Sequence, residues 1–414
     1  MIVQISNNAL VIALTLYVLS FILFVIGVVG KKWSNRDPEA HVRRYSRTAF
    51  ILACAGLASQ LVFFGTRWSY TGHLPISNMF EFLSTLGMMV AIAFTVIYLI
   101  YRSPLLGMFA TPVVVILIGY AAVFPWEAQP LIPALQSIWL YLHVSLAAIG
   151  EAFFAIGFAA GLMYLMRTVN FKEARWARRG VEFTVLSVLM VVGFIFIVFF
   201  FRGMGYEAQF ATVETVRDEA GNELEMPSTV TYTLPPIAAP HDSEVMYMDS
   251  FLGMDKPLFE TPGWMKGVNA GRKFNTVIWS VISGLILYGL LRLIARRPLG
   301  AAIQPALTDI NPDDLDEISY RSIAIGFPIF TLGALIFAMI WAQAAWGRFW
   351  GWDPKEVWAL IVWLFYSAYL HLRLSRGWLG AGSAWLAVIG FVIVMFTLVG
   401  VNLIIAGLHS YAGV

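Results

Sequence analysis

Ten long apolar runs recur along this 414-residue chain, and they restrict its fold more than any other feature. An apolar helix of roughly 17 to 25 residues crosses the hydrocarbon core of a bilayer. The runs occupy residues 9–29, 48–66, 79–101, 108–124, 139–166, 181–201, 275–294, 322–341, 357–373 and 383–405. Charged residues make up only 13% of the chain, which is low for a soluble protein. The sequence therefore predicts an all-α, polytopic integral membrane protein with about ten transmembrane helices and one long outer loop.

The distribution of Lys and Arg predicts how these helices are oriented, because cytoplasmic connections are enriched in both. Eighteen of the 27 Lys and Arg residues lie in five alternate connections, namely 30–47, 102–107, 167–180, 292–321 and 372–380. Both termini would then face outward from the cytoplasmic membrane. We expect an N-terminal membrane bundle over 1–201, an extracytoplasmic loop over 202–273 and a C-terminal membrane bundle over 274–414. The loop contains a short β-like stretch at 229–234.

Charge and cysteine content argue against several functions. The net charge is only +2 and no basic stripe is present, so nucleic acid is not an expected partner. Cys54 is the single cysteine and lies within an apolar run, which leaves no disulfide, thiol pair or zinc cluster within the chain. No nucleotide-binding glycine pattern occurs at a strand–helix junction. Any thiol chemistry must therefore come from a partner or a substrate.

Tryptophan is concentrated in one short segment. Six of the 15 tryptophans lie between Trp341 and Trp363, mixed with glycines, two carboxylates and the cations Arg348 and Lys355. Tryptophan offers a large flat surface at low entropic cost. An aromatic belt at the bilayer surface would explain one or two of them. At this density, we interpret the segment as a platform for a flat, apolar ligand that carries acid groups.

Two histidines flank this platform in the predicted topology. His143 opens the fifth apolar run and His409 follows the last, so both would lie on the outer face with the tryptophans. Two imidazoles beside an aromatic platform meet the needs of a bis-histidine haem site. Arg67, Arg348 and Lys355 are cations on the same face that are able to contact haem propionates. Solvated histidines and interfacial cations are the alternative interpretation.

His371 belongs to a different depth. It follows Asp353 by 18 residues, which on a helix is about 27 Å. It cannot share an iron with the outer histidines, and an inner bis-histidine site would need a ligand from another polypeptide. The alternative is a buried packing residue beside Tyr366 and Tyr369. The acidic segment 309–317 on the same side is expected to be a solvated turn.

The run from Trp346 to Arg373 closely resembles the tryptophan-rich (WWD) signature of the CcsA (ResC) family of system II cytochrome c biogenesis. The resemblance extends to Gly72-His73-Leu-Pro-Ile-Ser-Asn-Met-Phe-Glu81 and to Gly407-Leu-His409-Ser-Tyr411. It covers most apolar runs from about residue 60 onward. The chain departs from compact members of the family in its long loop over 202–273.

The resemblance implies a haem-handling subunit of the cytochrome c synthase, a haem lyase. This subunit would carry haem b across the membrane and present it at the outer face for thioether attachment to apocytochrome c. His143 and His409 would be the outer ligands of the haem iron, and His371 the inner ligand. The other expected haem-binding residues are Trp346, Arg348, Trp350, Trp352, Asp353, Glu356 and His73.

The resemblance also implies partners. A CcsB (ResB)-type membrane protein would supply the opposing inner ligand, and an apocytochrome c would supply a Cys-x-x-Cys-His motif. A thiol-reducing partner and membrane lipid are expected as well, and no residue of this chain is expected to act as a nucleophile. A b-type haem electron carrier or quinone oxidoreductase subunit is the main alternative, and a transporter with an aromatic vestibule is the other.

Overall fold

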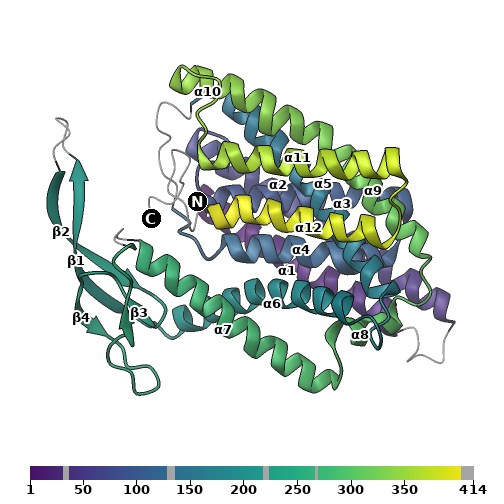
Figure 1. Cartoon of the computed structure of the whole chain (residues 1–414), viewed down its shortest axis with the longest axis horizontal. Coiled ribbons are helices and arrows are strands. Elements are labelled where there is room, and N and C mark those ends of the chain that lie inside the picture. Colours follow the sequence, from purple (N-terminus) through teal and green to yellow (C-terminus); the bar gives the residue numbers. More distant parts are fainter. Residues whose placement is uncertain (31–36, 128–135, 218–222, 266–268, 402–414) are drawn as a thin grey trace. The chain divides into compact units, whose positions relative to one another are not determined.

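The computed structural model describes residues 1–30, 37–127, 136–217, 223–265 and 269–401. Most of them are helical (Figure 1). The α-helices are α1 (Ile2–Val29), α2 (Pro38–Thr71), α3 (Met79–Tyr101), α4 (Pro104–Ala121), α5 (Ile138–Thr168), α6 (Arg175–Gly203), α7 (Ala270–Ala295), α8 (Leu299–Ile303), α9 (Pro312–Phe330), α10 (Ala338–Trp346), α11 (Pro354–Arg376) and α12 (Ala381–Met395). Two π-helical segments, η4 (Thr331–Phe337) and η5 (Phe396–Gly400), continue α9 and α12, and η3 (Gln304–Ala306) is a short 3-10 helix.

Ten helices of the described residues are long and apolar enough to cross a membrane. They are α1 to α7, the continuous helix Pro312–Trp346, α11, and the continuous helix Ala381–Gly400. Each overlaps one of the ten apolar runs, so the predicted all-α polytopic architecture is confirmed. The chain is a multi-pass membrane protein.

Local chemistry sets the helix ends near the tryptophan segment. α2 ends at Gly72, whose positive φ of 76° suits glycine. α3 begins after Asn78, whose side-chain oxygen accepts a hydrogen bond from the Glu81 backbone N–H at 2.9 Å. The short connection between them carries Leu74 and Ile76, which pack in one apolar cluster with residues of α5 and α10. The connection is thereby held against the tryptophan segment.

The described residues form two compact units. The first contains residues 1–181 and those from 300 onward, and α5 packs there against α3, α9 and α12. Gly150 of α5 lies so close to α9 that an added Cβ would be 2.6 Å from the Cβ of Phe330. Glycine permits this close helix contact inside a membrane. This close contact between α5 and α9 brings the start of α5, which carries His143, beside η4.

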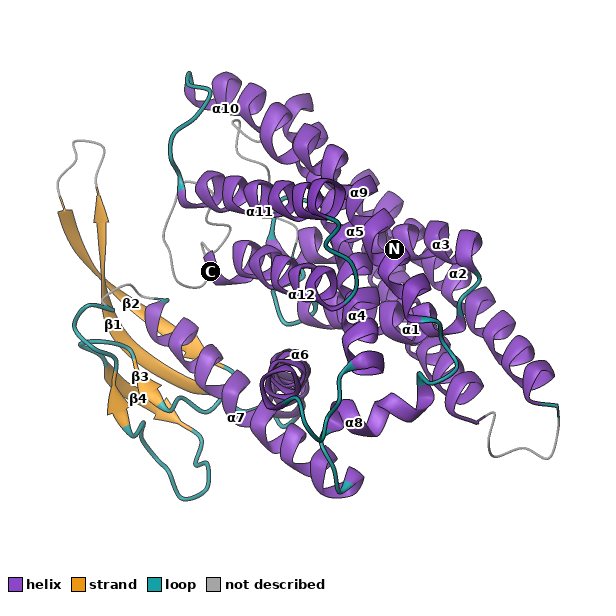
Figure 2. Ribbon diagram, turned by 45° about the vertical axis from the view of Figure 1, so that its right-hand side comes forward, coloured by secondary structure: helices purple, strands orange, loops and turns teal. Residues whose placement is uncertain are grey.

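The second unit contains residues 182–299 and all the strands (Figure 2). They are β1 (Ala208–Arg217), β2 (Glu223–Tyr232), β3 (Ala238–Ala239), β4 (Glu244–Met248) and β5 (Phe259–Glu260). β1 pairs antiparallel with β2 and β4, and β3 pairs parallel with β5. The expected β-like stretch at 229–234 therefore lies in β2 as far as Tyr232, whereas the sequence reading did not anticipate β1.

The strands are tied to α7 by one buried amide. The Asn275 side-chain oxygen accepts hydrogen bonds from the backbone N–H groups of Ile237 and Ala238, at 2.8 and 3.0 Å. Its side-chain nitrogen donates to the Ala238 carbonyl at 2.7 Å. The segment predicted as a loop thus contains β-structure that is anchored on a helix.

Candidate functional site

The start of α11 is closed by a capping box built from Asp353 and Glu356. The Asp353 carboxylate accepts a hydrogen bond from the Lys355 backbone N–H at 3.1 Å. The Glu356 carboxylate accepts in return from the backbone N–H groups of Asp353, at 3.2 Å, and Gly351, at 2.7 Å. These bonds satisfy donors that a helix N-terminus leaves free. Both carboxylates therefore shape the loop that precedes the helix.

That loop turns sharply at two positions. Gly347 ends α10 with φ of 70°, and Trp352 adopts φ of 58°, which is uncommon for a residue with a side chain. The turn leaves Trp352 72% exposed and packs it edge-to-face on Trp350, with ring centroids 6.1 Å apart. The capping box downstream supplies the contacts that hold this conformation.

His143 is oriented by a backbone carbonyl. Its Nδ1 lies 2.9 Å from the carbonyl oxygen of Gly333, which sits in the π-helical segment η4. A carbonyl can only accept, so this contact requires the proton on Nδ1 and leaves the lone pair of the neutral ring on Nε2. Histidines that bind metals are commonly held in this way. π-Helical turns are frequent at functional sites.

The His143 ring also lies parallel to Trp341, with centroids 6.0 Å apart and planes 10° apart. Trp341 is buried and contacts Trp346 edge-to-face at 4.7 Å. Trp341 was predicted to lie at the edge of the platform, without a role of its own. Its contact with His143 makes it the link between α5 and the tryptophan segment.

His143 and Trp341 line a cavity of about 120 Å³. Its apolar wall includes Met79, Phe82, Phe330, Phe349 and Trp350, and its polar wall includes Glu151, Lys355 and Glu356. The cavity wall thus combines one imidazole, aromatic rings, an ammonium group and two carboxylates.

Glu151 is a cavity residue that the sequence reading missed. It lies on α5 two turns beyond His143, is only 7% exposed, and interacts electrostatically with Lys355. Its Oε2 atom has no hydrogen-bond partner among the described residues. A carboxyl group inside a transmembrane helix is costly and usually functional. Glu151 is the single acidic residue in the apolar run 139–166, and this feature of the sequence could have identified it.

The predicted platform residues have different positions. Trp350 and Glu356 line the cavity, whereas Trp346 packs behind it in the apolar cluster with Trp341. The Arg348 side chain is exposed and folds back over Gly351, where an added Cβ would meet its Nη2 at 2.7 Å. The structure thus brings part of the predicted set to the cavity wall and leaves the rest behind or beside it.

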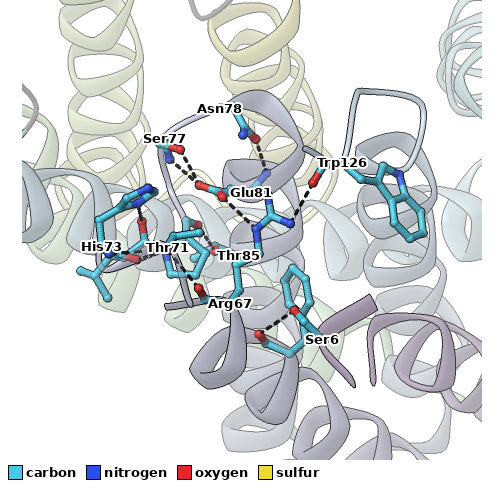
Figure 3. A network of polar contacts seen from close by, with 12 residues as sticks. Ser6, Arg67, Thr71, His73, Ser77, Asn78, Glu81, Thr85 and Trp126 are labelled. Carbon is cyan, nitrogen blue, oxygen red and sulfur yellow. Dashed lines mark hydrogen bonds and ion pairs between the residues drawn. The ribbon is translucent and has the colours of Figure 1, made fainter. Parts of the chain in front are cut away.

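His73 is held in the connection between α2 and α3 (Figure 3). Its Nδ1 lies 2.9 Å from the carbonyl oxygen of Leu74, while its backbone carbonyl accepts from the Thr71 hydroxyl at 2.9 Å. The residue is 6% exposed, and its Nε2 has no partner among the described residues. His73 is therefore oriented like His143, although it is not among the residues that line the cavity.

The prediction that Arg67 contacts a ligand is wrong. It was predicted on the outer face as a contact for propionates, but it is fully buried and donates to Glu81 at 2.8 Å and to the Trp126 carbonyl at 2.9 Å (Figure 3). Glu81 also accepts from the Ser77 hydroxyl and backbone N–H, at 2.6 and 3.0 Å. This buried pair holds the connection that carries His73, and burial by α2 and α3 removes Arg67 from any ligand surface.

The position of His371 also differs from one of the two interpretations of the sequence. The expectation of a buried residue beside Tyr366 and Tyr369 is wrong, because His371 is exposed while both tyrosines are buried. The reason is rotation about the helix axis: His371 shares an exposed face of α11 with three residues at helical spacing, namely Leu364, Ala368 and Ser375. The imidazole ring makes a weak contact with Ser375, whose Oγ lies 3.5 Å from Nδ1.

The acidic segment 309–317 was predicted to be a solvated turn, but only part of it is one. α9 already begins at Pro312, and Asp316 is buried. Its carboxylate accepts from Arg373 at 2.6 Å and from the Gly380 backbone N–H at 3.3 Å. Helix capping by Asn311 and this ion pair explain the difference. The pair fastens α11 to α9 close to His371.

His409 lies outside the described residues. Thr397 and Leu398 of η5 line the cavity that contains His143. The helix that precedes His409 therefore reaches the cavity wall.

Fold and cavity together define a polytopic membrane protein with a histidine- and tryptophan-lined site at one end of its bundle. The sequence model of the cytochrome C assembly protein family matches residues 74–205 and 277–409. The cytochrome c biogenesis protein CcsA of Crocosphaera subtropica is 32% identical over 351 residues, covering 84% of this chain and 82% of the relative. That of Prochlorococcus marinus is 30% identical over 414 residues, covering 99% and 97%. The chain belongs to the cytochrome c assembly protein family and acts in cytochrome c biogenesis.

Proposed function

We propose that this chain is the haem-handling subunit of a system II cytochrome c synthase. It carries haem across the cytoplasmic membrane and presents it at the outer face for attachment to apocytochrome c. The observation that carries the proposal is His143, fixed by the Gly333 carbonyl and stacked on Trp341 at the wall of an aromatic cavity. The relatives named for cytochrome c biogenesis support the same process.

Different cavity residues would hold different parts of the haem. His143 would bind the iron through Nε2, while Trp341 and Trp350 restrict the orientation of the porphyrin plane. Lys355 would meet the propionates, because it is the ammonium group on the cavity wall. His409 would complete the outer iron site. Asp353 and Glu151 both interact electrostatically with Lys355, so these carboxylates would balance its charge when no propionate is bound.

The chemical step needs positioning rather than a nucleophile from this chain. Each substrate cysteine adds its sulfur to one carbon of a haem vinyl group, and the thiol proton ends on the other vinyl carbon, so no atom is lost. Cys54 lies on α2 and is not among the cavity residues. The chain would contribute orientation, which can supply a large part of a rate enhancement. A thiol-reducing partner would keep the substrate cysteines reduced.

The inner site would be shared with a second membrane protein. His371 lies on an exposed face of α11, as a ligand completed by a partner helix should. A CcsB-type partner would cover this face and supply the opposing imidazole. A b-type electron carrier would instead need paired histidines at two depths within the bundle. Among the described cavity residues, His143 is the only histidine.

The proposal is tested with the purified protein and its partner chain by haem absorbance and by holocytochrome yield in cells. His143→Ala should remove the haem absorbance of the chain purified alone and reduce holocytochrome yield to background. Added imidazole should restore part of the yield, because it replaces the missing ligand. His41→Ala is the matched control, since His41 Nε2 lies near the Ile26 carbonyl on another part of the bundle. Full maturation by the His143 variant would exclude this assignment, as would an equal loss in both variants.

A further inference from the structure

A second cavity of about 880 Å³ lies at the far end of α3 from the tryptophan segment. Met79, at the start of α3, lines the first cavity, whereas Tyr98 and Arg102, at its end, line the second. The other walls come from one face of α2, from Pro104 and from Asp309. All of these residues belong to the first compact unit. This cavity has no part in the proposed haem function.

Helix length places the cavity at the depth of the lipid head groups. α2 has 34 residues, which is about 51 Å of helix, against roughly 30 Å of hydrocarbon. Its apolar run begins near residue 48, so Arg43 and Arg47 precede the membrane-embedded part. These two arginines line the cavity together with Arg102. The arginine-bearing wall therefore lies where lipid phosphates lie.

The cavity has a cationic rim and an aromatic floor. Phe50 and Tyr98 stack at its base, with ring centroids 4.4 Å apart and planes 18° apart. Arg102 is held in a left-handed conformation at the end of α3, and its Nε donates to the Leu99 carbonyl at 3.2 Å. Two carboxylates, Glu39 and Asp309, are also present, so the arginines leave one positive charge in excess. Within the described residues, none of the three arginines forms a salt bridge with a carboxylate.

Apolar side chains are also exposed on the two helices that carry this floor. Ile51 of α2 follows Phe50 in the sequence, and Leu99 and Ile100 of α3 follow Tyr98, and all three are exposed. A soluble anion would use only the arginines, whereas a phospholipid would use both the cationic rim and this apolar surface. Basic pockets between transmembrane helices are suited to anionic head groups.

We propose that this cavity binds the phosphate head group of an anionic phospholipid. Arg43, Arg47 and Arg102 hold the phosphate, and the acyl chains lie against the exposed apolar side chains of α2 and α3. Arginine suits this task because its planar guanidinium group can pair with two phosphate oxygens at once.

The test uses the full chain purified in neutral detergent, with phosphatidylglycerol or phosphatidylcholine added. Lipid retention is measured by native mass spectrometry and stability by thermal unfolding. Phosphatidylglycerol should be retained and should raise the Tm, while phosphatidylcholine should do neither. Arg43→Gln with Arg47→Gln should weaken phosphatidylglycerol retention by roughly fivefold per arginine removed.

Arg44→Gln is the matched control, because Arg44 is exposed on the same turn of α2 but does not line the cavity. If this control lost as much phosphatidylglycerol retention per arginine removed, the effect would be one of diffuse charge and the proposal would be overturned. Stabilisation by inorganic phosphate to the same extent as by phosphatidylglycerol would also overturn it, in favour of a soluble anion. Arg43→Lys with Arg47→Lys should keep most of the retention, and the Tm of each variant without lipid shows that it folds.

Discussion

The two ends of α11 carry the two predicted haem sites, and they are built in different ways. At its start, the capping box fixes the tryptophan loop and His143 is locked by the Gly333 carbonyl at 2.9 Å. At its end, His371 is exposed, and its ring contact with Ser375 spans 3.5 Å. The first end is shaped by contacts within the chain, whereas the second presents an imidazole on a helix surface.

This difference indicates how haem could be handled in sequence. A preorganised imidazole holds a metal in one geometry at little further cost. An exposed imidazole on a helix face acquires its geometry only when another surface covers it. The start of α11 therefore suits presentation of the ligand, and its end suits acquisition at an interface with a partner.

The largest expected effect separates the two ends by their need for a partner. His371→Ala should reduce holocytochrome yield to background when the partner chain is present, because the inner iron would lose one ligand. In the chain purified alone, the same substitution should leave haem binding at the start of α11 unchanged. Haem absorbance with and without the partner measures both effects. A loss in the isolated chain would show that the two sites are not independent.

The next effect concerns the hydrogen bond by which the Gly333 carbonyl orients His143. Gly333→Ala places a methyl group against the backbone of Leu146 and Ala147, so η4 must move away from α5. We expect a loss of about 1 to 3 kcal/mol in unfolding free energy, as for other overpacked cores, and a loss of haem at the outer site. Gly65→Ala is the control, since an added Cβ there meets nothing within 4 Å. Equal haem retention by the two variants would show that the Gly333 contact is dispensable.

A smaller effect is expected at the helix cap. Asp353→Ala removes the side-chain acceptor at the start of α11 and should lower the unfolding free energy by about 1 kcal/mol. Asp353→Asn keeps an acceptor and should recover most of this loss. Thermal unfolding of the two variants measures the difference, and haem absorbance shows whether the tryptophan loop depends on the cap. If both variants were equally destabilised, the charge rather than the cap would be responsible.

The smallest effect is expected for the neighbour of His371. Ser375→Ala removes a hydroxyl that lies 3.5 Å from the imidazole, beyond the usual length of a strong hydrogen bond. The unfolding free energy should change by less than about 0.5 kcal/mol, and holocytochrome yield should stay within measurement error. A clear loss of yield would mean that Ser375 orients His371 as Gly333 orients His143, and the contrast between the two ends would disappear.

Much of the architecture could be predicted because hydropathy and helix caps are local properties. The ten spans follow from runs of apolar residues that must cross the bilayer, and Asp353-Pro-Lys-Glu356 is a helix start that the sequence displays. The burial of Arg67 and the exposure of His371 could not be read locally. Each depends on which helix face meets a neighbour, and an apolar span in a membrane can bury either face.

The sequence by itself determined the number of spans, the tryptophan segment, the family and the types of residue available for a haem site. Only the tertiary structure decided that Trp341 stacks on His143, that Glu151 and Lys355 line the same cavity, and that Trp352 is exposed. The physical reason is separation along the chain. His143 and Gly333 are 190 residues apart, and only the close packing of α5 against α9 and η4 brings them within one hydrogen bond.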